Sequence, residues 1–465
     1  MSGIFGVVGK SNCLEDLFYG TDYHSHLGTQ FAGLAVWEGN RFMRKIHDIS
    51  GSQFKSKFYE DYKKMRGSKG IGVISARDEQ PIYVNSKFGP FVIATNGFID
   101  NSEELARQLY KTGQSFSETS EGKINFTELV AKLIIQSKDI ISGIENMFSK
   151  IDGSCSLLLL NKQGIYAARD RYGYTPLAVG RRKRDLAVTT ETAAFSNLGF
   201  KVFKYLQPGE IVLINKTGMR IRRKGSATNQ ICAFLWIYTG FPASSYEGIT
   251  VEMVRERCGK FLAKNDHAKV DIAAGIPDSG TTHAIGYAMQ SKIPLRRPLV
   301  KYTPGFDRSY TPSSQQTRDL IAKMKLIPIQ EIIKGKSIAI CDDSIVRGTQ
   351  LKNFTIQKLK ECGAKEMHLR IACPPLMFPC KFNYSTRSIH ELITRRAIKA
   401  IEGKDLKDLG AYLDEDSPEY KKMVKWITKD IGSTTLKYQK LDDMVKAIGL
   451  PKNKLCLYCW TGRER

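Results

Sequence analysis

The sequence lacks several features that would assign it to particular classes of protein. No window approaches about 18 consecutive apolar residues, the length at which a membrane-spanning helix is considered, so we expect no membrane partner. The run Met1–Lys10 lacks the basic region and cleavage site of a secretory signal peptide, and we expect a cytoplasmic protein. Repeats and low-complexity tracts are also missing, and the composition, 42% apolar and 25% charged, is that of a globular protein.

Acidic residues are scarce relative to basic ones. Lys and Arg number 71 against 47 Asp and Glu, which gives a formal net charge of +24. This charge favours anionic ligands and makes nucleic acid a partner to consider. The basic residues are dispersed, however, and the densest clusters, Arg181–Arg184 and Arg220–Lys224, fall near predicted turns. A solvated basic surface is therefore favoured over a nucleic-acid partner.

The 465 residues exceed what one hydrophobic core supports, so two or three domains are expected. Residues 1 to about 225 mix short strands with helical periods, which indicates an α+β layered domain. From about residue 230 strands and helices alternate, which is typical of βαβ units and a parallel sheet. N-terminal strands are predicted over Gly3–Val8, Gly33–Trp37, Gly70–Ser75, Phe91–Thr95, Cys155–Leu160 and Glu210–Ile214, and helices over Ser102–Thr112 and Asn125–Ser137. C-terminal helices are predicted over Ile249–Lys264, Thr281–Gln290 and Gln350–Cys362, strands over Asp271–Gly275, Ser337–Cys341 and Glu366–Ala372, and several short helices over Glu391–Leu450.

The stretch from Ser337 to Thr349 is the most informative part of the chain. The predicted strand Ser337–Cys341 ends at two carboxylates, Asp342 and Asp343, and a loop of hydroxyls and one glycine follows over Ser344–Thr349. A strand, a loop of small residues and a helix start form a phosphate-binding geometry, because backbone N–H groups and the helix dipole face the anion. The acidic pair repels a bare phosphate but suits the hydroxyls of a sugar phosphate. The alternative is an ordinary βα turn.

These motifs, in this order, resemble the amidophosphoribosyltransferase family, which uses glutamine and phosphoribosyl pyrophosphate (PRPP) in purine synthesis. The resemblance covers nearly the whole chain. It implies an α+β Ntn-type (αββα) glutaminase-like domain over residues 1–228 and an α/β type I phosphoribosyltransferase domain with a parallel sheet over residues 229–465. The motifs that carry it are Ile276–Gly280, Met324–Leu326, Asp342-Asp343, Pro374-Pro375, Pro379-Cys380 and Cys456–Cys459, with weaker support from Ala167–Gly173 and Pro208–Glu210.

The resemblance implies distinct roles for the residues of the second domain. Asp342 and Asp343 would hold the ribose hydroxyls, and Lys325, at the end of a predicted mobile lid over Tyr302–Lys325, would bring positive charge to the leaving pyrophosphate. Magnesium would accompany PRPP. The 5-phosphate would be bound by Ser344, Ile345, Val346, Arg347, Gly348 and Thr349, and the pyrophosphate by Asp278, Ser279, Gly280 and Thr281. The alternatives are a simple turn over Pro277–Thr281 and a solvated surface loop in place of the lid.

Two positions in the second domain depart from the family pattern. Ile327 stands where an asparagine is usual, and Asp307 where a glycine is usual. The isoleucine removes a polar side chain expected near the pyrophosphate. The departures bear on transfer activity more than on PRPP binding.

The N-terminal domain departs further from its family. The family's nucleophile is a cysteine whose own α-amino group serves as base, whereas this chain has Ser2. Ser75 takes the place of the arginine that would clamp the glutamine carboxylate, and Phe126 replaces the acid that would hold its amine. The oxyanion-hole pair Asn96-Gly97 remains.

The missing clamps decide what this degenerate site is expected to do. A buried charge-assisted hydrogen bond is worth roughly 1.5–3 kcal/mol. Losing two such bonds therefore weakens the binding of glutamine by at least about a hundred-fold. We therefore expect no glutaminase activity. The alternative is an acylase for another substrate, with Ser2 as nucleophile.

Cysteine usage suggests metal binding rather than a disulfide framework. Four of the ten cysteines fall where iron–sulfur members of the family place their ligands. A [4Fe–4S] cluster is the first hypothesis and zinc the alternative for the same ligands; unmetallated buried thiols remain a third. The four are Cys232, Cys380, Cys456 and Cys459.

Three functions compete at this point. The first is an ammonia-using phosphoribosyltransferase that makes 5-phosphoribosylamine. The second is a non-catalytic regulator that binds PRPP or a purine nucleotide. A base-salvage transferase is the least favoured. The resemblance also implies a homo-oligomer.

Overall fold

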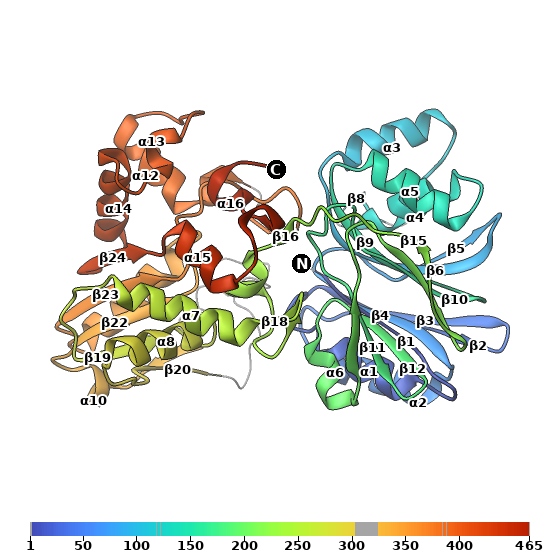
Figure 1. Ribbon diagram of the computed structural model, residues 1–465, viewed down its shortest axis with the longest axis horizontal. Coiled ribbons are helices and arrows are strands. Elements are labelled where there is room, and N and C mark those ends of the chain that lie inside the picture. Colours follow the sequence, from blue (N-terminus) through green and yellow to red (C-terminus); the bar gives the residue numbers. More distant parts are fainter. Residues whose placement is uncertain are drawn as a thin grey trace.

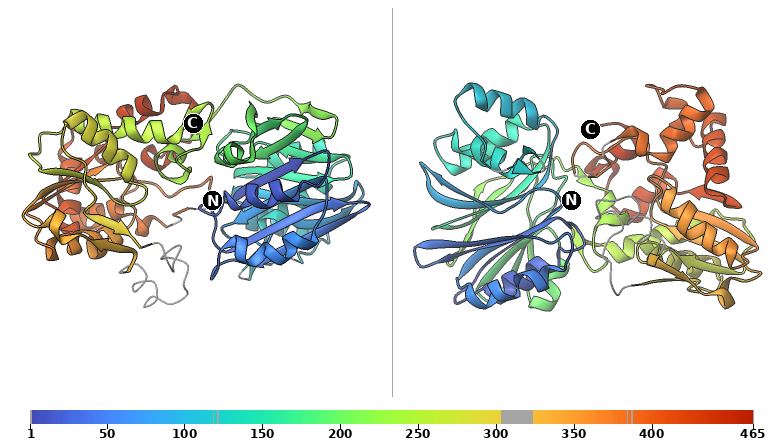
Figure 2. Two further views of the ribbon diagram at one scale, coloured as in Figure 1. Left: turned by 90° about the horizontal axis from the view of Figure 1, so that it is seen from below. Right: turned by 180° about the vertical axis from the view of Figure 1, so that it is seen from behind.

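The protein forms two lobes that lie side by side, with the N-terminus between them (Figure 1). This computed structural model describes residues 2–117, 119–120, 122–302, 324–383, 385–386 and 388–464. Two further views show the same division (Figure 2). Within the described part of the chain, no helix is long and apolar enough to cross a membrane.

The N-terminal lobe contains two antiparallel sheets. The first sheet has the order β13 (Lys201–Tyr205), β11 (Ala178–Arg182), β12 (Asp185–Thr189), β1 (Gly3–Val8), β4 (Lys69–Ser75), β2 (Phe31–Glu38) and β3 (Arg41–Asp48). The second has the order β15 (Gly218–Arg223), β14 (Ile211–Asn215), β10 (Gly164–Ala168), β9 (Gly153–Asn161), β6 (Gly89–Ile99) and β5 (Ile82–Ser86). A short hairpin joins β7 (Thr119–Ser120) and β8 (Lys123–Ile124).

The two sheets pack face to face between two layers of helices, because successive side chains of each strand point to opposite faces. In β1, Ile4 and Val8 face the second sheet, whereas Phe5 and Val7 face the helices. The first sheet is covered by α1 (Leu14–Asp22), α2 (Phe54–Lys64) and α6 (Ala193–Leu198), and the second by α3 (Ser102–Lys111), α4 (Phe126–Ile135) and α5 (Ile140–Lys150). The predicted αββα layering is confirmed.

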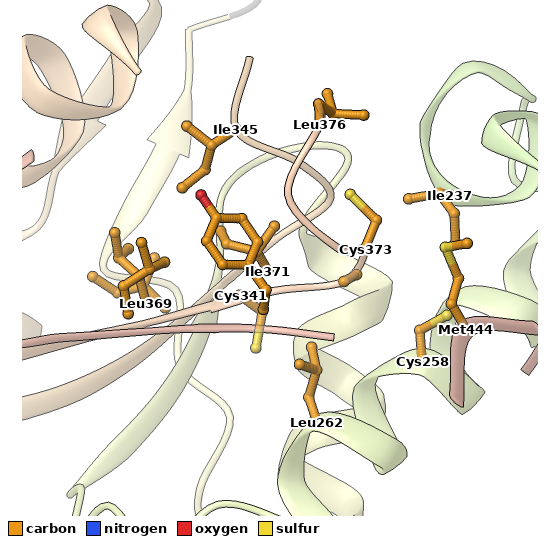
Figure 3. Packing of buried hydrophobic residues seen from close by; sticks show 14 of the residues in the cluster. Ile237, Cys258, Leu262, Cys341, Ile345, Leu369, Ile371, Cys373, Leu376 and Met444 are labelled. Atoms are coloured by element: carbon orange, nitrogen blue, oxygen red, sulfur yellow. The ribbon is translucent and has the colours of Figure 1, made fainter. Parts of the chain in front are cut away.

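The C-terminal lobe is built on a parallel sheet with the order β19 (Ile272–Gly275), β22 (Ser337–Asp342), β23 (Glu366–Ile371) and β24 (Thr435–Tyr438). This confirms the predicted parallel sheet. Its major helices are α7 (Val251–Lys264), α8 (Thr281–Ser291), α12 (Ile393–Glu402), α14 (Pro418–Ile431) and α15 (Leu441–Ile448). Buried side chains from the sheet and helices, including Cys341, Ile371 and Leu262, form one core (Figure 3).

Short elements complete this lobe and its junction with the first. The strands are β16 (Ile231–Cys232), β17 (Ser245–Tyr246), β18 (Ile249–Thr250), β20 (Leu299–Lys301), β21 (Leu326–Pro328) and β25 (Leu455–Cys456). The helical segments are η1 (Leu235–Thr239), α10 (Gln330–Ile333), η2 (Leu351–Ile356), α11 (Gln357–Glu361), η3 (Ile389–Glu391), α13 (Gly410–Leu413), η4 (Lys452–Lys454) and α16 (Tyr458–Thr461).

The structure differs from the sequence-based expectations at two elements. β24 lies inside Glu391–Leu450, which was predicted to be helical; its four residues are too few to show a clear period of two, and pairing with β23 makes them a strand. The predicted helix Gln350–Cys362 begins as a π-helical turn, η2, before α11. The boundary between residues 228 and 229 stays a prediction, with β15 ending at Arg223 and β16 starting at Ile231.

Candidate functional site

Two loops meet at the carboxyl ends of the neighbouring parallel strands β19 and β22. Gly275 lies opposite Cys341 in the register of these strands. The Ile276 amide donates to Cys341 O at 3.0 Å, and the Ser279 side chain is near enough to Asp343 to lower the pKa of its carboxyl against the larger effect of burial. The turn that follows β19 and the acidic pair that follows β22 therefore form one site, where open α/β sheets bind ligands.

The two carboxyls of the acidic pair lie close together, with Asp343 buried and Asp342 half-buried. Asp343 is 5% exposed; its amide donates to Asp342 Oδ1 at 2.9 Å, and the Ser344 hydroxyl donates to Asp343 Oδ1 at 2.5 Å. Burial raises the pKa of both carboxyls, and the charge of Asp343 raises the pKa of Asp342 further, against a smaller opposing effect of Lys325. Two close, poorly solvated carboxylates favour a ligand that brings hydroxyl donors or a cation.

The loop Ser344–Thr349 is held in place from both sides. Ile345 is buried in the core beneath it (Figure 3), and the Ile393 amide at the start of α12 donates to Val346 O at 2.8 Å. Arg347 forms an ion pair with Glu391. The loop between β22 and η2 is thus anchored by Ile345, Val346 and Arg347.

The turn Pro277–Thr281 is equally constrained. The Gly280 amide donates to Ile276 O at 2.8 Å, and α8 begins at Thr281. A Cβ atom on Gly280 would lie 2.3 Å from Cys341 O, so only glycine permits this approach of the two loops. Asp278, which is exposed, pairs with Lys301 Nζ at 2.7 Å. This charge partner for the predicted pyrophosphate turn was not foreseen.

The predicted lid Tyr302–Lys325 lies mostly outside the described residues, which omit 303–323 and therefore Asp307. Its two ends are joined, because β20 pairs with β21 and the Tyr302 amide donates to Lys325 O at 2.8 Å. Lys325 is near enough to the acidic pair to lower the pKa of Asp342. Ile327 is 48% exposed on β21.

Arg255 is a further charged residue at this site that the sequence reasoning missed. It is 3% exposed on α7, and its guanidinium donates to Trp236 O at 3.0 Å and to Gly240 O at 2.8 Å. Its charge lowers the pKa of Asp343 against the larger effect of burial. The sequence did contain one indication of this role, since Arg255 lies next to the apolar residues Val254 and Cys258 on the buried face of a predicted helix.

In the N-terminal lobe, Ser2 lies beside Asn96-Gly97, the pair predicted to form an oxyanion hole. The Ser2 amide donates to Asn96 Oδ1 at 3.2 Å, and Ser2 Oγ accepts from the Ala76 amide at 3.3 Å. Gly97 has φ 148°, and a Cβ there would lie 2.0 Å from Ser154 O. The pocket between these residues and Phe126 has a volume of about 20 Å³, room for about one water molecule.

Ser75 and Phe126, which replace the two charged residues expected of the family, both make specific contacts with neighbouring side chains or backbone. Ser75 Oγ accepts from the Asp78 amide at 3.1 Å and from Gln80 Nε2 at 3.2 Å, so it shapes the turn after β4. Phe126 is 8% exposed, and the Arg77 guanidinium lies 4.0 Å from the centroid of its ring. Arg77, two residues beyond the expected arginine, also pairs with Asp78 at 3.6 Å. Sequence reasoning missed it because it tested only the aligned position.

The four candidate metal-binding cysteines come together from distant segments. β16 pairs with β25 so that Cys232 lies opposite Cys456, and the Cys459 thiol is hydrogen bonded to Cys380. Burial raises the pKa of Cys232 to about 12. All ten cysteines are free thiols. Among the residues described, no group of three or more His, Cys, Asp or Glu side chains is arranged as a metal-ion site.

Comparison with known proteins follows the same division of the chain. The glutamine amidotransferase domain family matches residues 68–197. The amidophosphoribosyltransferase of Methanocaldococcus jannaschii is 32% identical over 494 residues, which cover 100% of this chain and 97% of that protein. The Bacillus subtilis amidophosphoribosyltransferase is 29% identical, over 99% of this chain and 93% of that protein.

A solved structure of the B. subtilis glutamine PRPP amidotransferase, complexed with ADP and GMP, superimposes with a TM-score of 0.85 at 29% identity and covers 99% of this chain and 97% of that one. The αββα lobe and the parallel-sheet lobe are thus an Ntn glutaminase-type domain joined to a type I phosphoribosyltransferase domain. The full-length identity is specific enough for the family: this chain belongs to the amidophosphoribosyltransferases.

Proposed function

We propose that this chain binds PRPP at the two loops beside β19 and β22 and forms 5-phosphoribosylamine from ammonia without hydrolysing glutamine. One contrast carries the proposal. The acidic pair and both loops are present at the strand ends, whereas the pocket beside Ser2 has a volume of only about 20 Å³.

The roles of the site residues follow from their positions. Asp342 and Asp343 would accept hydrogen bonds from the ribose hydroxyls, Ser344–Thr349 would bind the 5-phosphate, and Asp278–Thr281 would bind the pyrophosphate. Mg²⁺ bound with PRPP would neutralise part of the pyrophosphate charge. Lys325 would add positive charge to the leaving group from the end of the predicted lid.

The reaction needs no covalent intermediate with the protein. The ammonia lone pair attacks C1 of the ribose, the bond between C1 and the pyrophosphate oxygen breaks, and the new ammonium group gives up a proton to solvent. The protein's contribution is to position the sugar phosphate, stabilise the departing pyrophosphate and exclude water. Ammonia must come from solvent if no glutaminase releases it.

The shape of the N-terminal pocket supports the loss of glutaminase activity. Small-molecule sites are typically about 300–1,000 Å³, whereas this pocket is about 20 Å³. Phe126 occupies the place of the acid expected at the glutamine amine, and Arg77 lies against its ring. Ser2 is also a weaker nucleophile than cysteine.

The four clustered cysteines would hold a structural [4Fe–4S] group, with zinc as the alternative. Their donor set supports this, since it consists of four thiols, of which Cys456 and Cys380 pack with the aromatic rings of Tyr174, Phe382 and Tyr458. The group would fix the junction strand β16 to the tail strand β25. Its role would be structural, with no step in the transfer reaction.

A regulatory protein is the second candidate. Ile327 on β21 and the filled glutamine pocket favour it, because both depart from what a working amidotransferase needs. Two solved relatives bear on ligands: one is described with ADP and GMP, and another, at 28% identity and a TM-score of 0.85, as the allosteric regulatory enzyme of purine biosynthesis. On this reading the chain would bind PRPP or a purine nucleotide as a homo-oligomer.

Pyrophosphate release distinguishes the two candidates. The protein is incubated with PRPP, Mg²⁺ and either ammonia or glutamine across a pH series, alongside the Ile327→Asn variant. The enzyme should release pyrophosphate with ammonia only, faster at higher pH because more ammonia is unprotonated. If neither protein releases pyrophosphate at any pH, while PRPP still binds in calorimetry, the regulatory function takes its place.

A further inference from the structure

A second cavity lies at the other end of the N-terminal sandwich from Ser2. Side chains alternate along β4, so Lys69, Ile71, Val73 and Ser75 share the face that packs against the second sheet. Ser75 ends this row beside the degenerate glutamine pocket, and Lys69 ends it at the opposite edge. The hairpin of β2 and β3 lies at that edge, on the side of the lobe away from the C-terminal lobe (Figure 1).

The cavity has the size of a metabolite site. Its volume is about 560 Å³, within the range of about 300–1,000 Å³ that is typical of small-molecule sites. The end of β1 and the turns β2–β3, β9–β10 and β14–β15 surround it. Val8 and Trp37 supply an apolar part of its wall.

Three lysines and one glutamate line this cavity, and the glutamate is already engaged. Glu38 pairs with Arg41 at 3.3 Å. Lys162 and Lys216 are exposed on the β9–β10 and β14–β15 turns, so their ammonium groups can move toward a ligand. The cavity therefore has an excess of positive charge.

Lys69 distinguishes this cavity from an ordinary basic surface, because its side chain is buried. It is 9% exposed, its ammonium donates to Lys162 O, and it lies 5.2 Å from the centroid of the Trp37 ring. Among the described residues no carboxylate pairs with it. Burial, with a smaller effect of Lys216, lowers the pKa of Lys69 to about 8. A lysine this buried is almost always paired, and here the counter-charge is missing from the protein itself.

We propose that this cavity is a binding site for a small organic polyanion, with Lys69 as its buried anchor and Lys162 and Lys216 as outer contacts. The ligand would carry two or more carboxylate or phosphate groups and an apolar part against Trp37. Its binding would supply the charge that Lys69 lacks. This site is separate from the proposed PRPP site, which lies in the other lobe, and does not depend on it.

Calorimetric titration with citrate and, separately, with fructose 1,6-bisphosphate tests the proposal and distinguishes polycarboxylate from phosphate ligands. Ionic strength is held constant, because screening alone alters surface charge effects. Lys69→Gln should weaken binding about ten- to a hundred-fold, since it removes a buried charge-assisted bond. Lys216→Glu should weaken it at least about three-fold, and it lies on an exposed turn that tolerates the change.

The matched control is Lys57→Gln, which removes one positive charge from the exposed face of α2 in the same lobe. It should leave both affinities unchanged. Trp37→Phe provides a second readout, because ligand-induced changes in tryptophan fluorescence should vanish in it. If neither probe binds at millimolar concentration, or if binding is equal in wild type, Lys69→Gln and Lys216→Glu, the proposal is wrong. In the latter case the anion binds elsewhere, for example at the loop Ser344–Thr349.

Discussion

The two lobes differ in how many of the site residues expected of the family they contain. The C-terminal lobe retains an acidic pair and two constrained loops at adjacent strand ends, where Gly280 alone allows the backbone contact. The N-terminal lobe retains its layers and the pair Asn96-Gly97, but Phe126 and Arg77 contact each other and line a pocket of only about 20 Å³. The comparison shows that the layers of this lobe persist although Ser75 and Phe126 differ from the residues expected of the family, and Phe126 itself packs in the core.

The N-terminal lobe also has a structural reason to persist. Glu191, which is 1% exposed after β12, accepts hydrogen bonds from Tyr246 at 2.8 Å and from Ser244, both in the C-terminal part of the chain. His26 Nε2 lies 3.2 Å from the same carboxylate. Leaving a buried carboxylate without such partners strongly destabilises the folded protein. These contacts therefore hold the two lobes together independently of any glutaminase chemistry.

The largest expected difference between the lobes is in glutamine hydrolysis. The wild type and Ser2→Cys should both release no detectable glutamate from glutamine, with or without PRPP, because a restored thiol still lacks both charged clamps and the room for substrate. Glutamate release is measured by a coupled assay, with Ser2→Ala as the control. Release by the wild type that disappears in Ser2→Ala would instead support the serine acylase alternative.

The cysteine cluster is expected to respond in an all-or-none way. Anaerobically purified protein should be brown, with about four iron and four sulfide per chain, and Cys459→Ser should lose the colour. Cys362→Ser is the matched control, since Cys362 is not among the four. Colourless protein with one zinc per chain would mean that the same thiols bind zinc, and metal-free protein would refute the metal site.

PRPP affinity probes the retained site. The double change Asp342→Asn and Asp343→Asn keeps the shape but removes two charge-assisted acceptors, and should cost about 2–4 kcal/mol of binding free energy. Thermal stability should be kept or raised, because repulsion in a buried carboxylate pair disappears. Calorimetry measures the PRPP affinity of the wild type and of the double variant, and the surface change Asp405→Asn is the control. Equal affinity in the double variant would overturn the site assignment.

Acid stability offers a comparison in which each lobe contributes a fully buried histidine with a lowered pKa. Burial lowers the pKa of His24 to about 4 and the pKa of His283 to about 3, from an ordinary 6.5. Protonation therefore favours the unfolded chain, and stability is lost as pH falls from 6.5 toward these values. Each histidine contributes a slope of up to about 1.4 kcal/mol per pH unit.

Urea unfolding at several pH values between neutrality and mild acid measures this slope. His24→Gln and His283→Gln should each flatten it, since neither replacement can bind a proton. The exposed His267 provides the matched control, and His267→Gln should leave the slope unchanged. Parallel curves for all four proteins would show that other groups dominate acid unfolding.

The smallest effect is expected at Ile327. Because its side chain is 48% exposed, Ile327→Asn should change stability by no more than about 0.5 kcal/mol. Any change should appear in pyrophosphate release rather than in PRPP affinity. An effect on affinity as large as that of the Asp342 and Asp343 double variant would mean that β21 contributes to ground-state binding.

Contiguous motifs were predictable from the sequence because their geometry is local. The strand, acidic pair and loop from Ser337 to Thr349 occupy one segment, and so does the alternation of Ile4 and Val8 with Phe5 and Val7 in β1. Hydrophobic period and turn residues determine such segments with little help from the rest of the chain. The α+β class of the first domain and the parallel sheet of the second followed from these elements, whereas the αββα layering was implied by the family resemblance.

Contacts between distant segments were decided only by the tertiary structure. β24 becomes a strand because β23 offers it a pairing edge. The approach of Cys232 to Cys456, which the family resemblance had implied, depends on β16 and β25 pairing across more than two hundred intervening residues. The position of Arg255 by Asp343 and the burial of Lys69 are likewise invisible in spacing. The physical reason is that pairing, desolvation and charge–charge energies depend on distance in space, which a local pattern of residues does not specify.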